Sequence, residues 1–557
     1  MIFGYRNSYP RFGAGALAIT ACMTLAAAVP ICARAQGWGP EERVTTSVTD
    51  SETGLSRSPM AADSRGRVHI VWCEQDGAAL NYQINARTRG VVTWESSQRA
   101  VAYAPAFPGS SGGAKYPAIV ADAEDSVHIA WHDYRVGGIQ NVEIFTKSRG
   151  ADAGWDTSGA GELRLTRSNH AETNGDNSYV PSLYQSATGE VGAVWFDFRF
   201  DNENAEILFK ARAWGAGGGE WDTTAGDGPD MNLSQTPGNS TYPAVAAAPS
   251  GAVHVVWMEQ GAGVAVLHRV RDAVTNAWGV TETVVSGNDV IGYPAAAVDA
   301  AGVLHVVWVD ARDGSQAIFA RARLESGTWG SESRVSPAGV NAQEPAVAAS
   351  VDGMIHVAWH DTRVSLLNRE VYLQSKSASD SWDPSGASDY RVSSASAHST
   401  RPSLLADALG NLHVLWKDRR DGNAEIYYRA WRNPALTGVL WPSDGWDDAL
   451  DALGGASANI SAPIAARVFP NPVRDGALGA IDIARAGPLS IALYDVAGRR
   501  VRDVWSGVAS AGTRYVPIEF GGTVRGALPR GVYFLRAESA GCAASARILF
   551  FPEAGRR

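Results

Sequence analysis

The stretch His305–Gly314 reads HVVWVDARDG, and close variants of it recur along the 557-residue chain. Aligning the variants on their tryptophan gives seven copies, spaced by 51 to 64 residues. In six copies a histidine lies three residues before the tryptophan, and in all seven a proline lies thirteen or fourteen residues before it. The aligned residues are Trp72, Trp131, Trp195, Trp257, Trp308, Trp359 and Trp416.

Each copy predicts four β strands. One follows the proline, one ends at the tryptophan, one resembles EIYYRA at 425–430, and the last closes with a tripeptide such as RVS. Glycine and aspartate lie between these segments, as hairpin turns require. The second strand is apolar at nearly every position, which predicts that both of its faces are covered. A four-stranded unit repeated seven times in this way is typical of a β-propeller.

The two ends of the repeat region complement each other. Residues 38–47 (WGPEERVTTS) resemble a fourth strand without its three predecessors, while the seventh copy has three strands and no clear fourth. Together they would complete one blade and remove exposed sheet edges. We therefore predict an all-β chain whose residues 37–432 form a seven-bladed β-propeller closed by an N-terminal strand.

The first 35 residues have the pattern of a secretory signal peptide. Arg6 and Arg11 precede an apolar run from Gly13 to about Val29, and Ala33–Ala35 form a small-x-small cleavage pattern. The alternative is a membrane anchor, but the apolar run is shorter than the roughly 20 residues that a spanning helix needs. We expect a secreted protein with no transmembrane span in the mature chain.

The number of cysteines and the net charge argue against several classes of site and partner. Cys22 and Cys32 would leave with the signal peptide, although lipid attachment at Cys22 is an alternative, and only Cys73 and Cys542 would remain. A disulfide scaffold and a zinc site are therefore not expected. The formal charge of −10 and the lack of a basic stripe argue against nucleic acid as a partner.

The C-terminal part changes in composition. Residues 433–465 are rich in Ala, Gly, Ser and Asp, as linkers are. Residues 466–557 contain short strands with Asn-Pro and Gly turns, which predicts a small β-sandwich.

The strand motifs of this part carry a resemblance. Asn471-Pro472, the segment Tyr494–Arg499 (YDVAGR) and Gly531–Phe534 (GVYF) are similar to motifs of the C-terminal sorting domain of type IX secretion cargo, and of the related Ig-like domain of flagellar hook-capping proteins. The resemblance implies an Ig-like domain, passage through an outer membrane or attachment to the cell surface, and the secretion machinery as a partner.

Five copies of the repeat end in Trp-x-Asp-x-Arg, and this pattern allows two interpretations. In one, a ring of carboxylates and guanidiniums surrounds a central mouth and binds anionic or polyhydroxyl ligands. In the other, the aspartate accepts turn amides and the arginine pairs with it or with the next blade. A residue present in every blade meets a need that every blade has, which favours folding. The candidate ligand-binding arginines are Arg135, Arg199, Arg312, Arg363 and Arg420.

Function is expected where the repeat is broken. The first copy has Glu74 and the fourth has Glu259 in place of the aspartate. The third copy has an extended loop that contains Asp201 and Glu203, weak candidates for calcium because carboxylate oxygens suit that ion. The spacing fits no defined calcium loop, so we expect neither a metal nor another cofactor.

The first copy resembles the sialidase superfamily of propellers. Ser56–Pro59 (SRSP) and Gly66–Asp76 (GRVHIVWCEQD) have the relative places of that family's Arg-x-Pro and GTLLAFAExR strands. The resemblance implies that Arg57 binds a sugar carboxylate and that Glu74 orients it. The second family arginine, however, falls on Asp76, no general-acid aspartate follows, and no Asp-box is intact.

Sialidases use a tyrosine nucleophile activated by a carboxylate. Four tyrosines precede the blade-opening strands near the mouth, but they recur and are better explained by packing. They are Tyr116, Tyr179, Tyr242 and Tyr293.

We therefore expect an exported, surface-associated, sialidase-like propeller that binds an extracellular glycan or glycoprotein without catalysis. One alternative is a glycoside hydrolase of the exo-sialidase type, with Arg57, Glu74 and Asp197 as weak catalytic candidates. A second alternative is a scaffold that engages other proteins.

Overall fold

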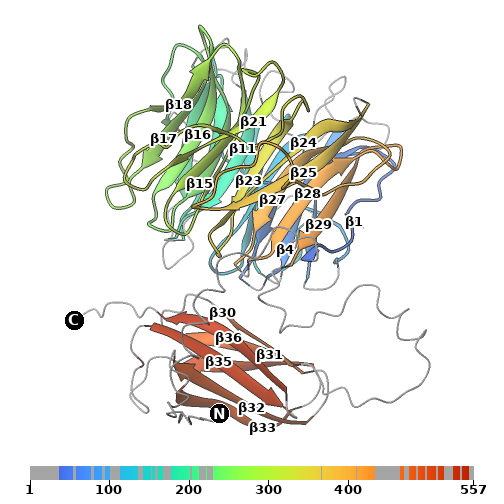
Figure 1. The fold of residues 1–557 in the computed structure, drawn as a ribbon, viewed down its shortest axis with the longest axis vertical. Helices are drawn as coiled ribbons and strands as arrows, with labels where there is room; N and C mark the ends of the chain where they lie inside the picture. Colours follow the sequence, from blue (N-terminus) through green and yellow to red (C-terminus); the bar gives the residue numbers. More distant parts are fainter. Residues whose placement is uncertain are drawn as a thin grey trace, which may run out of the picture.

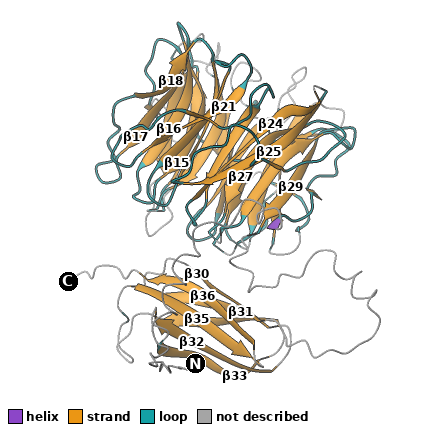
Figure 2. Cartoon of the chain, in the orientation of Figure 1, coloured by secondary structure: helices purple, strands orange, loops and turns teal. Residues whose placement is uncertain are grey.

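The computed structural model describes residues 37–432 and 464–550, with internal gaps, and within them the chain is all β (Figure 2). The expected signal peptide, residues 433–463 of the expected linker, Arg57, Asp201 and Glu203 lie outside the described residues. No helix in the described part is long and apolar enough to cross a membrane. The gaps are 54–57, 65, 77–80, 91–93, 101–112, 136–141, 152, 157–160, 167–176, 188, 201–203, 213–220, 222–229, 366, 409, 470–475, 484–486, 496–498, 510–511, 520–527, 529–530 and 540–541.

Seven antiparallel sheets follow one another through the described residues up to Trp431 (Figure 1). The first sheet contains β2 (Ser51–Glu52), β3 (Met60–Ala62), β4 (Val68–Asp76), β5 (Asn81–Arg89) and β6 (Gln98–Arg99). The second contains β7 (Ala114–Ala121), β8 (Val127–Asp133), β9 (Glu143–Arg149) and β10 (Leu163–Arg164), and the third β11 (Ser178–Gln185), β12 (Val191–Asp197), β13 (Glu206–Arg212) and β14 (Met231–Asn232).

The remaining four sheets repeat this order. The fourth contains β15 (Asn239–Ala247), β16 (Val253–Gln260), β17 (Val264–Arg271) and β18 (Glu282–Gly287), and the fifth β19 (Val290–Val298), β20 (Leu304–Asp310), β21 (Ala317–Arg323) and β22 (Ser333–Arg334). The sixth contains β23 (Gln343–Ala349), β24 (Met354–Ser365), β25 (Asn368–Ser377) and β26 (Tyr390–Arg391). The seventh contains β27 (Ser399–Ala406), β28 (Leu412–Asp418), β29 (Glu425–Trp431) and β1 (Glu42–Arg43).

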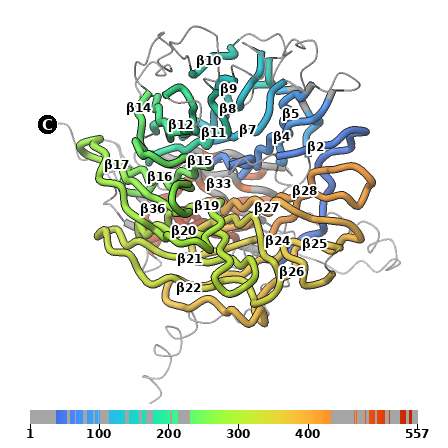
Figure 3. The backbone as a smooth tube through the Cα atoms, turned by 90° about the horizontal axis from the view of Figure 1, so that it is seen from above, coloured from blue at the N-terminus to red at the C-terminus, as the bar shows by residue number. Residues whose placement is uncertain are grey.

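The sheets have a propeller-like arrangement. The first strand of each sheet contacts the first strand of the next, and β27 of the seventh sheet contacts β3 of the first. Figure 3 shows the first strands near the centre and the later strands toward the periphery, for example along β7, β8, β9 and β10. The inner strands therefore form a closed ring.

The N-terminal strand completes the seventh sheet, as the sequence predicts. Glu42 and Arg43 of β1 pair antiparallel with β29, and Trp38 forms a further bridge to Trp431. The Arg43 guanidinium donates to the Glu425 carboxylate at 2.8 Å. The two ends of the ring are therefore joined by backbone hydrogen bonds and by an ion pair.

The second strand of each sheet is the centre of the packing. Its tryptophan is at most 2 % exposed in all seven sheets, and β8, β20 and β28 are buried at every position. Trp131 packs with Val71 and Ile84 of the preceding sheet, so the indole joins two sheets. The prediction that both faces of this strand are covered is confirmed.

The recurrent histidines are packing residues with hydrogen-bonded rings. His128 Nε2 lies 2.8 Å from the Asp122 carboxylate and its Nδ1 lies 2.6 Å from the Ser148 hydroxyl. Asp122 also accepts the amides of Glu124 and Ser126 in the turn between the first two strands. The histidine therefore ties a turn to the third strand.

The third sheet lacks this histidine for a steric reason. A Cβ at Gly192 would collide with the ring of Tyr184, which fills the space that the imidazole occupies elsewhere. The Tyr184 hydroxyl donates to Glu190 at 2.5 Å, and Arg271 of the next sheet pairs with the same carboxylate. In the third sheet a tyrosine therefore replaces the histidine as the residue that hydrogen-bonds the turn between the first two strands.

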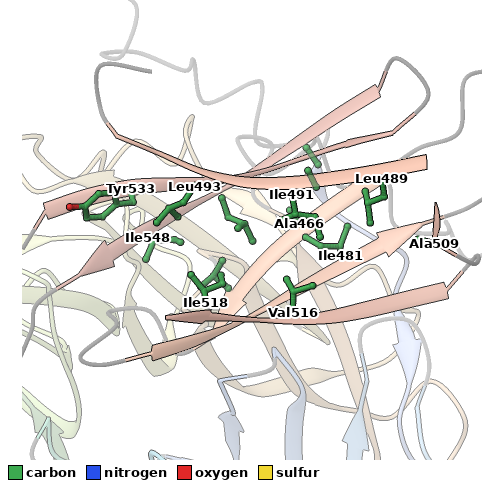
Figure 4. Packing of buried hydrophobic residues seen from close by; sticks show 14 residues of the cluster. Ala466, Ile481, Leu489, Ile491, Leu493, Ala509, Val516, Ile518, Tyr533 and Ile548 are labelled. Atoms are coloured by element: carbon green, nitrogen blue, oxygen red, sulfur yellow. The ribbon is translucent and has the colours of Figure 1, made fainter. Parts of the chain in front are cut away.

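The C-terminal part consists of two antiparallel sheets around one apolar core (Figure 4). Leu493, Leu535, Ile548, Ile481 and Val516 belong to this core and are at most 2 % exposed. The first strand begins at Ile464, slightly before the expected end of the linker. The strands are β30 (Ile464–Phe469), β31 (Gly476–Ile483) and β34 (Gly512–Glu519) in one sheet, and β33 (Arg500–Ala509), β32 (Gly487–Asp495), β35 (Gly531–Ser539) and β36 (Cys542–Phe550) in the other.

A buried histidine pair makes the stability of the ring depend on pH. His254 Nδ1 lies 3.0 Å from His268 Nε2, and His268 Nδ1 lies 3.2 Å from Glu282. Burial, and then the neighbouring His268, lower the pKa of His254 to about 3. An unfolded histidine titrates near pH 6.5, so below that pH the unfolded chain binds more protons than the folded chain.

We expect the free energy of unfolding to fall by about 2 kcal/mol per such histidine between pH 7 and 5. In His254→Gln the fall should be smaller by about this amount. Denaturant unfolding at pH 7, 6 and 5, followed by tryptophan fluorescence, measures both proteins. Identical pH dependence in the variant and the parent would contradict the assignment.

Candidate functional site

The candidate site is the mouth of the ring, on the face where the first strands begin and the second strands end. Two positions of each sheet meet there: the residue before the inner-strand proline, and the residue after the buried tryptophan. In six sheets the residue before the proline is a non-glycine residue in the left-handed region, with φ between 50° and 54°. These residues are Tyr116, Val180, Tyr242, Tyr293, Glu344 and Arg401.

This backbone conformation brings side chains of neighbouring sheets together. Proline cannot donate to the sheet, and the pairing of the first and second strands shifts in register at this point, for example between Thr241 and Ala244. The left-handed region costs a non-glycine residue roughly 1 kcal/mol. The rings of Tyr242 and Tyr293, from adjacent sheets, lie 5.0 Å apart, so these residues line a common mouth.

One side of the mouth is a continuous series of rings, here called the aromatic arc. It runs over the second to fifth sheets, with centroid distances of 4.7 Å from Tyr116 to His132 and 5.4 Å from His132 to Tyr179. The series continues through Phe196 to Tyr242 at 5.9 Å. Apart from His132 the rings are partly exposed. The aromatic arc consists of Tyr116, His132, Tyr179, Phe196, Tyr242 and Tyr293.

The other side of the mouth is charged and is here called the ionic arc. Arg401 Nη1 lies 3.3 Å from Glu52 and its Nε lies 3.5 Å from Glu344. Lys417 also pairs with Glu52, and His360 Nδ1 lies 3.3 Å from Glu344. The side chains of Glu52, Glu344 and Arg401 are 26 to 30 % exposed, so a ligand could reach them.

In two sheets the residue after the buried tryptophan is a histidine whose ring nitrogens form no hydrogen bond with the described residues. His132 and His360 are each 1 % exposed, and neither forms a hydrogen bond through its ring with the described residues, although His360 Nδ1 has the contact with Glu344 given above. Burial, and then the charge of Lys115, lower the pKa of His132 to about 3, so its imidazole is neutral. Buried polar atoms without partners are uncommon and often face a ligand or water.

Lys115 lies where the two arcs meet. It precedes Tyr116 and pairs with His132 across the second sheet. Its Nζ lies 4.3 Å from the ring centroid of Tyr82 and 5.7 Å from that of Tyr134, which are cation–π distances. Burial lowers the pKa of this ammonium group. No ion pair or hydrogen bond of its side chain is formed with the described residues.

A small cavity of about 60 Å³ lies between the inner strands. Its lining includes Ser58, Ser182, Ser403, Ala244 and Ala295. A space of this size suits a few water molecules.

The five candidate arginines are each held between two carboxylates. Arg199 is the most buried: its guanidinium lies 2.8 Å from Asp197 of its own turn and 2.8 Å from Asp230, just before the outer strand. The aspartate also accepts the indole N–H of Trp195 at 2.9 Å. The equivalent trios are Asp133–Arg135–Glu162, Asp310–Arg312–Glu332, Asp361–Arg363–Asp389 and Asp418–Arg420–Glu41.

These contacts favour the folding interpretation of the arginines over ligand binding. Four of the guanidiniums also lie over an aromatic ring of the third strand, at 3.7 Å from the centroid for Arg363 and Tyr372. Their charge is already neutralised inside their own sheets.

The remaining candidates are carboxylates in similar structural roles. Glu74 accepts the indole N–H of Trp72 at 3.0 Å, which is the contact that the aspartate makes elsewhere. Glu259 accepts the Ser240 hydroxyl at 2.6 Å and forms no ion pair with the described residues. Neither residue belongs to the aromatic or the ionic arc. Among the described residues no group of three potential metal ligands occurs.

Sequence reasoning missed two features that it could have found. The second carboxylate of each trio precedes the outer strand by one residue, as Glu162 precedes Leu163, and this position is acidic in five copies. The mouth positions are marked by their variation, because the residue before the proline changes from tyrosine to Glu344 and Arg401 while the proline itself recurs in every copy.

Comparison with known proteins gives similarity in structure alone. No family model matches the chain, and no curated protein matches it. A fungal alcohol oxidase of the AA5 family with copper is 12 % identical, with 92 % of this chain and 99 % of that chain covered and a TM-score of 0.43. The polysaccharide lyase Uly1 is 10 % identical over 68 % and 90 % of the chains, with a TM-score of 0.44.

The Hadza microbial sialidase Hz136 is 14 % identical, with 58 % of this chain and 65 % of that chain covered and a TM-score of 0.38. At these identities and TM-scores the similarities carry no information about activity.

Removing one arginine of a trio should destabilise the ring. In Arg199→Ala the carboxylates of Asp197 and Asp230 lose their shared guanidinium in a buried place, and we expect a loss of about 3 kcal/mol in the free energy of unfolding. Arg369→Ala is the control, since that side chain forms no ion pair with the described residues, and it should change the free energy by less than about 0.5 kcal/mol. Urea unfolding measures both variants, and equal losses would argue against the role of the trio.

Proposed function

We propose that this chain is an exported, surface-associated, sialidase-like propeller of seven blades whose mouth binds an extracellular glycan or glycoprotein without catalysis. The observation that carries the proposal is that the partly exposed rings of the aromatic arc and the charged groups of the ionic arc line one mouth, at positions where the side chains differ between sheets. Everything that recurs is used to hold the sheets together. The varied positions are the ones left to recognise a ligand.

The composition of the mouth suits a sugar chain. Ligand sites combine apolar and aromatic surface with a few placed polar groups. The partly exposed rings of Tyr179, Tyr242 and Tyr293 offer flat apolar faces against which a pyranose ring can pack. Arg401, Glu52 and Glu344 offer charged donors and acceptors for hydroxyl groups beside them.

The electrostatics of the mouth tyrosine argue against a sialidase-type nucleophile. Tyr116 lies near Glu52 and Arg401, which is the one observation that favours a glycoside hydrolase. Burial, however, raises the pKa of Tyr116 and so opposes the phenolate that would attack a sugar.

Export and attachment complete the proposal. Residues 1–35 would direct secretion and be removed, 433–465 would form the linker, and 466–557 would act as an Ig-like sorting domain that engages the secretion machinery. The two-sheet sandwich around Leu493 and Leu535 supports this assignment of the C-terminal part.

Glycan binding can be tested by affinity electrophoresis in gels that contain dextran, galactomannan, xyloglucan or polygalacturonate. We expect the chain to be retarded by at least one of these polysaccharides. Tyr242→Ala combined with Tyr293→Ala should reduce the affinity about tenfold or more, because each substitution removes a ring face. Val274→Ala, on an exposed turn of the fourth sheet, is the control. Retention only on a protein partner would instead support the scaffold alternative.

Catalysis can be tested with a fluorogenic sialoside. We expect no turnover above the buffer rate by the purified chain. Turnover that is lost in Arg57→Ala but kept in Arg269→Ala would overturn the non-catalytic part of the proposal and support the exo-sialidase alternative.

A further inference from the structure

Cations without an ion pair lie beside the ionic arc, although the whole chain has a formal charge of −10. Arg401 and Lys417 share Glu52, and Arg419 lies 3.3 Å from Asp50. Two further cations in this region, Lys115 and Arg369, have side chains without an ion pair to the described residues. Lys115 and Arg369 therefore add positive charge beside ion pairs that already use Asp50, Glu52 and Glu344.

The pKa shifts of His398 and Lys115 show which charged groups lie near them. Burial lowers the pKa of His398, and the charges of Arg369, His360 and Arg419 lower it further. Glu52 and Cys73 act on Lys115 in the opposite direction to its burial. Arg369 and Arg419 are therefore near His398, and Lys115 is near Glu52.

Lys115 is the least compensated of them. A half-buried ammonium group without an ion pair is unfavourable, and the Tyr82 ring at 4.3 Å offsets only part of the cost. The buried nitrogens of His132, its neighbour across the sheet, also lack partners among the described residues. An anion bound at this point would supply the missing partner to the ammonium group.

We infer that the ligand is an anionic polysaccharide, whose carboxylate or sulfate group binds between Lys115 and Arg401 while an adjoining sugar packs on the aromatic arc. The inference rests on the proposed function and names its substrate class. Lys115 is suited to this role because it lies at the junction of the two arcs. A neutral polymer would leave its ammonium group unpaired.

Three soluble polysaccharides that differ in charge test the inference. Dextran is the neutral polymer, dextran sulfate is its sulfated form, and polygalacturonate is a carboxylated polymer. Binding is measured by isothermal titration calorimetry at 50 and 300 mM NaCl. We expect at least one polyanion to bind at least tenfold more tightly than dextran, with affinity that falls as salt rises. The stronger of the two polyanions identifies the anionic group.

Lys115→Gln should weaken the preferred polyanion about tenfold, the loss of one ion pair of about 1.4 kcal/mol, and leave the affinity for dextran unchanged. Arg401→Gln should have a similar effect. Lys376→Gln is the control, because Lys376 lies at the far end of β25, where its Nζ donates to Asp380. Unfolding midpoints of all variants establish that they are folded.

The outcomes separate the two proposals. Equal binding of dextran and the polyanions, or a polyanion affinity that Lys115→Gln and Arg401→Gln leave unchanged, would overturn the inference and leave glycan binding standing. No binding of any polysaccharide, here or in the gels, would overturn glycan binding itself.

Discussion

The buried indole of the second strand imposes a sequence of requirements on every sheet. A strand covered on both faces encloses the tryptophan N–H, and a buried donor needs an acceptor. The aspartate two residues later supplies it, as Asp361 does for Trp359 at 2.8 Å. A buried carboxylate in turn needs compensation, which Arg363 provides, and Asp389 then balances the arginine. One hydrophobic residue therefore explains three charged ones.

The fourth sheet shows what happens when this sequence is interrupted. Glu259 stands where the aspartate is expected, the arginine is absent, and the indole N–H of Trp257 has no partner among the described residues. Glu259 hydrogen-bonds Ser240 instead. The first sheet keeps the indole contact through Glu74, so a longer carboxylate alone does not cause the loss. The tryptophan, the two carboxylates and the arginine thus form one hydrogen-bonded network, in which each polar group depends on the others for a partner.

The period of the repeat and the elements that satisfy local rules could be predicted from the sequence. The strand order and the packing histidines follow from the repeat itself, and the closing strand at Glu42–Arg43 follows from the fourth strand that the seventh copy lacks. The side-chain partners could not be predicted from the repeat: Glu162 pairs with Arg135 across one sheet, and Arg401 reaches Glu52 across the two ends of the ring. The ionic arc was missed because its residues touch only after the ring closes.

The tyrosines of the mouth show the limit of arguing from recurrence. Their repetition suggests packing, and their rings do pack on one another. The left-handed backbone at the same position, however, recurs also in sheets with glutamate and arginine. The backbone is thus the repeated feature, and the side chain it carries is free to vary. Recurrence of a residue and recurrence of a conformation are different signals, and the conformation is the one shared by six of the seven sheets.

The position of the ionic arc links recognition to the closure of the ring. Glu52 pairs with Cys73 of the first sheet through its backbone and with Lys417 of the seventh sheet through its side chain. The aromatic arc, by contrast, crosses sheets that follow one another along the chain. An anion at the ionic arc would compete with Glu52 for Arg401 and Lys417. Binding there would weaken one ionic contact of the closing joint while the backbone pairing of β1 with β29 still holds the ring shut.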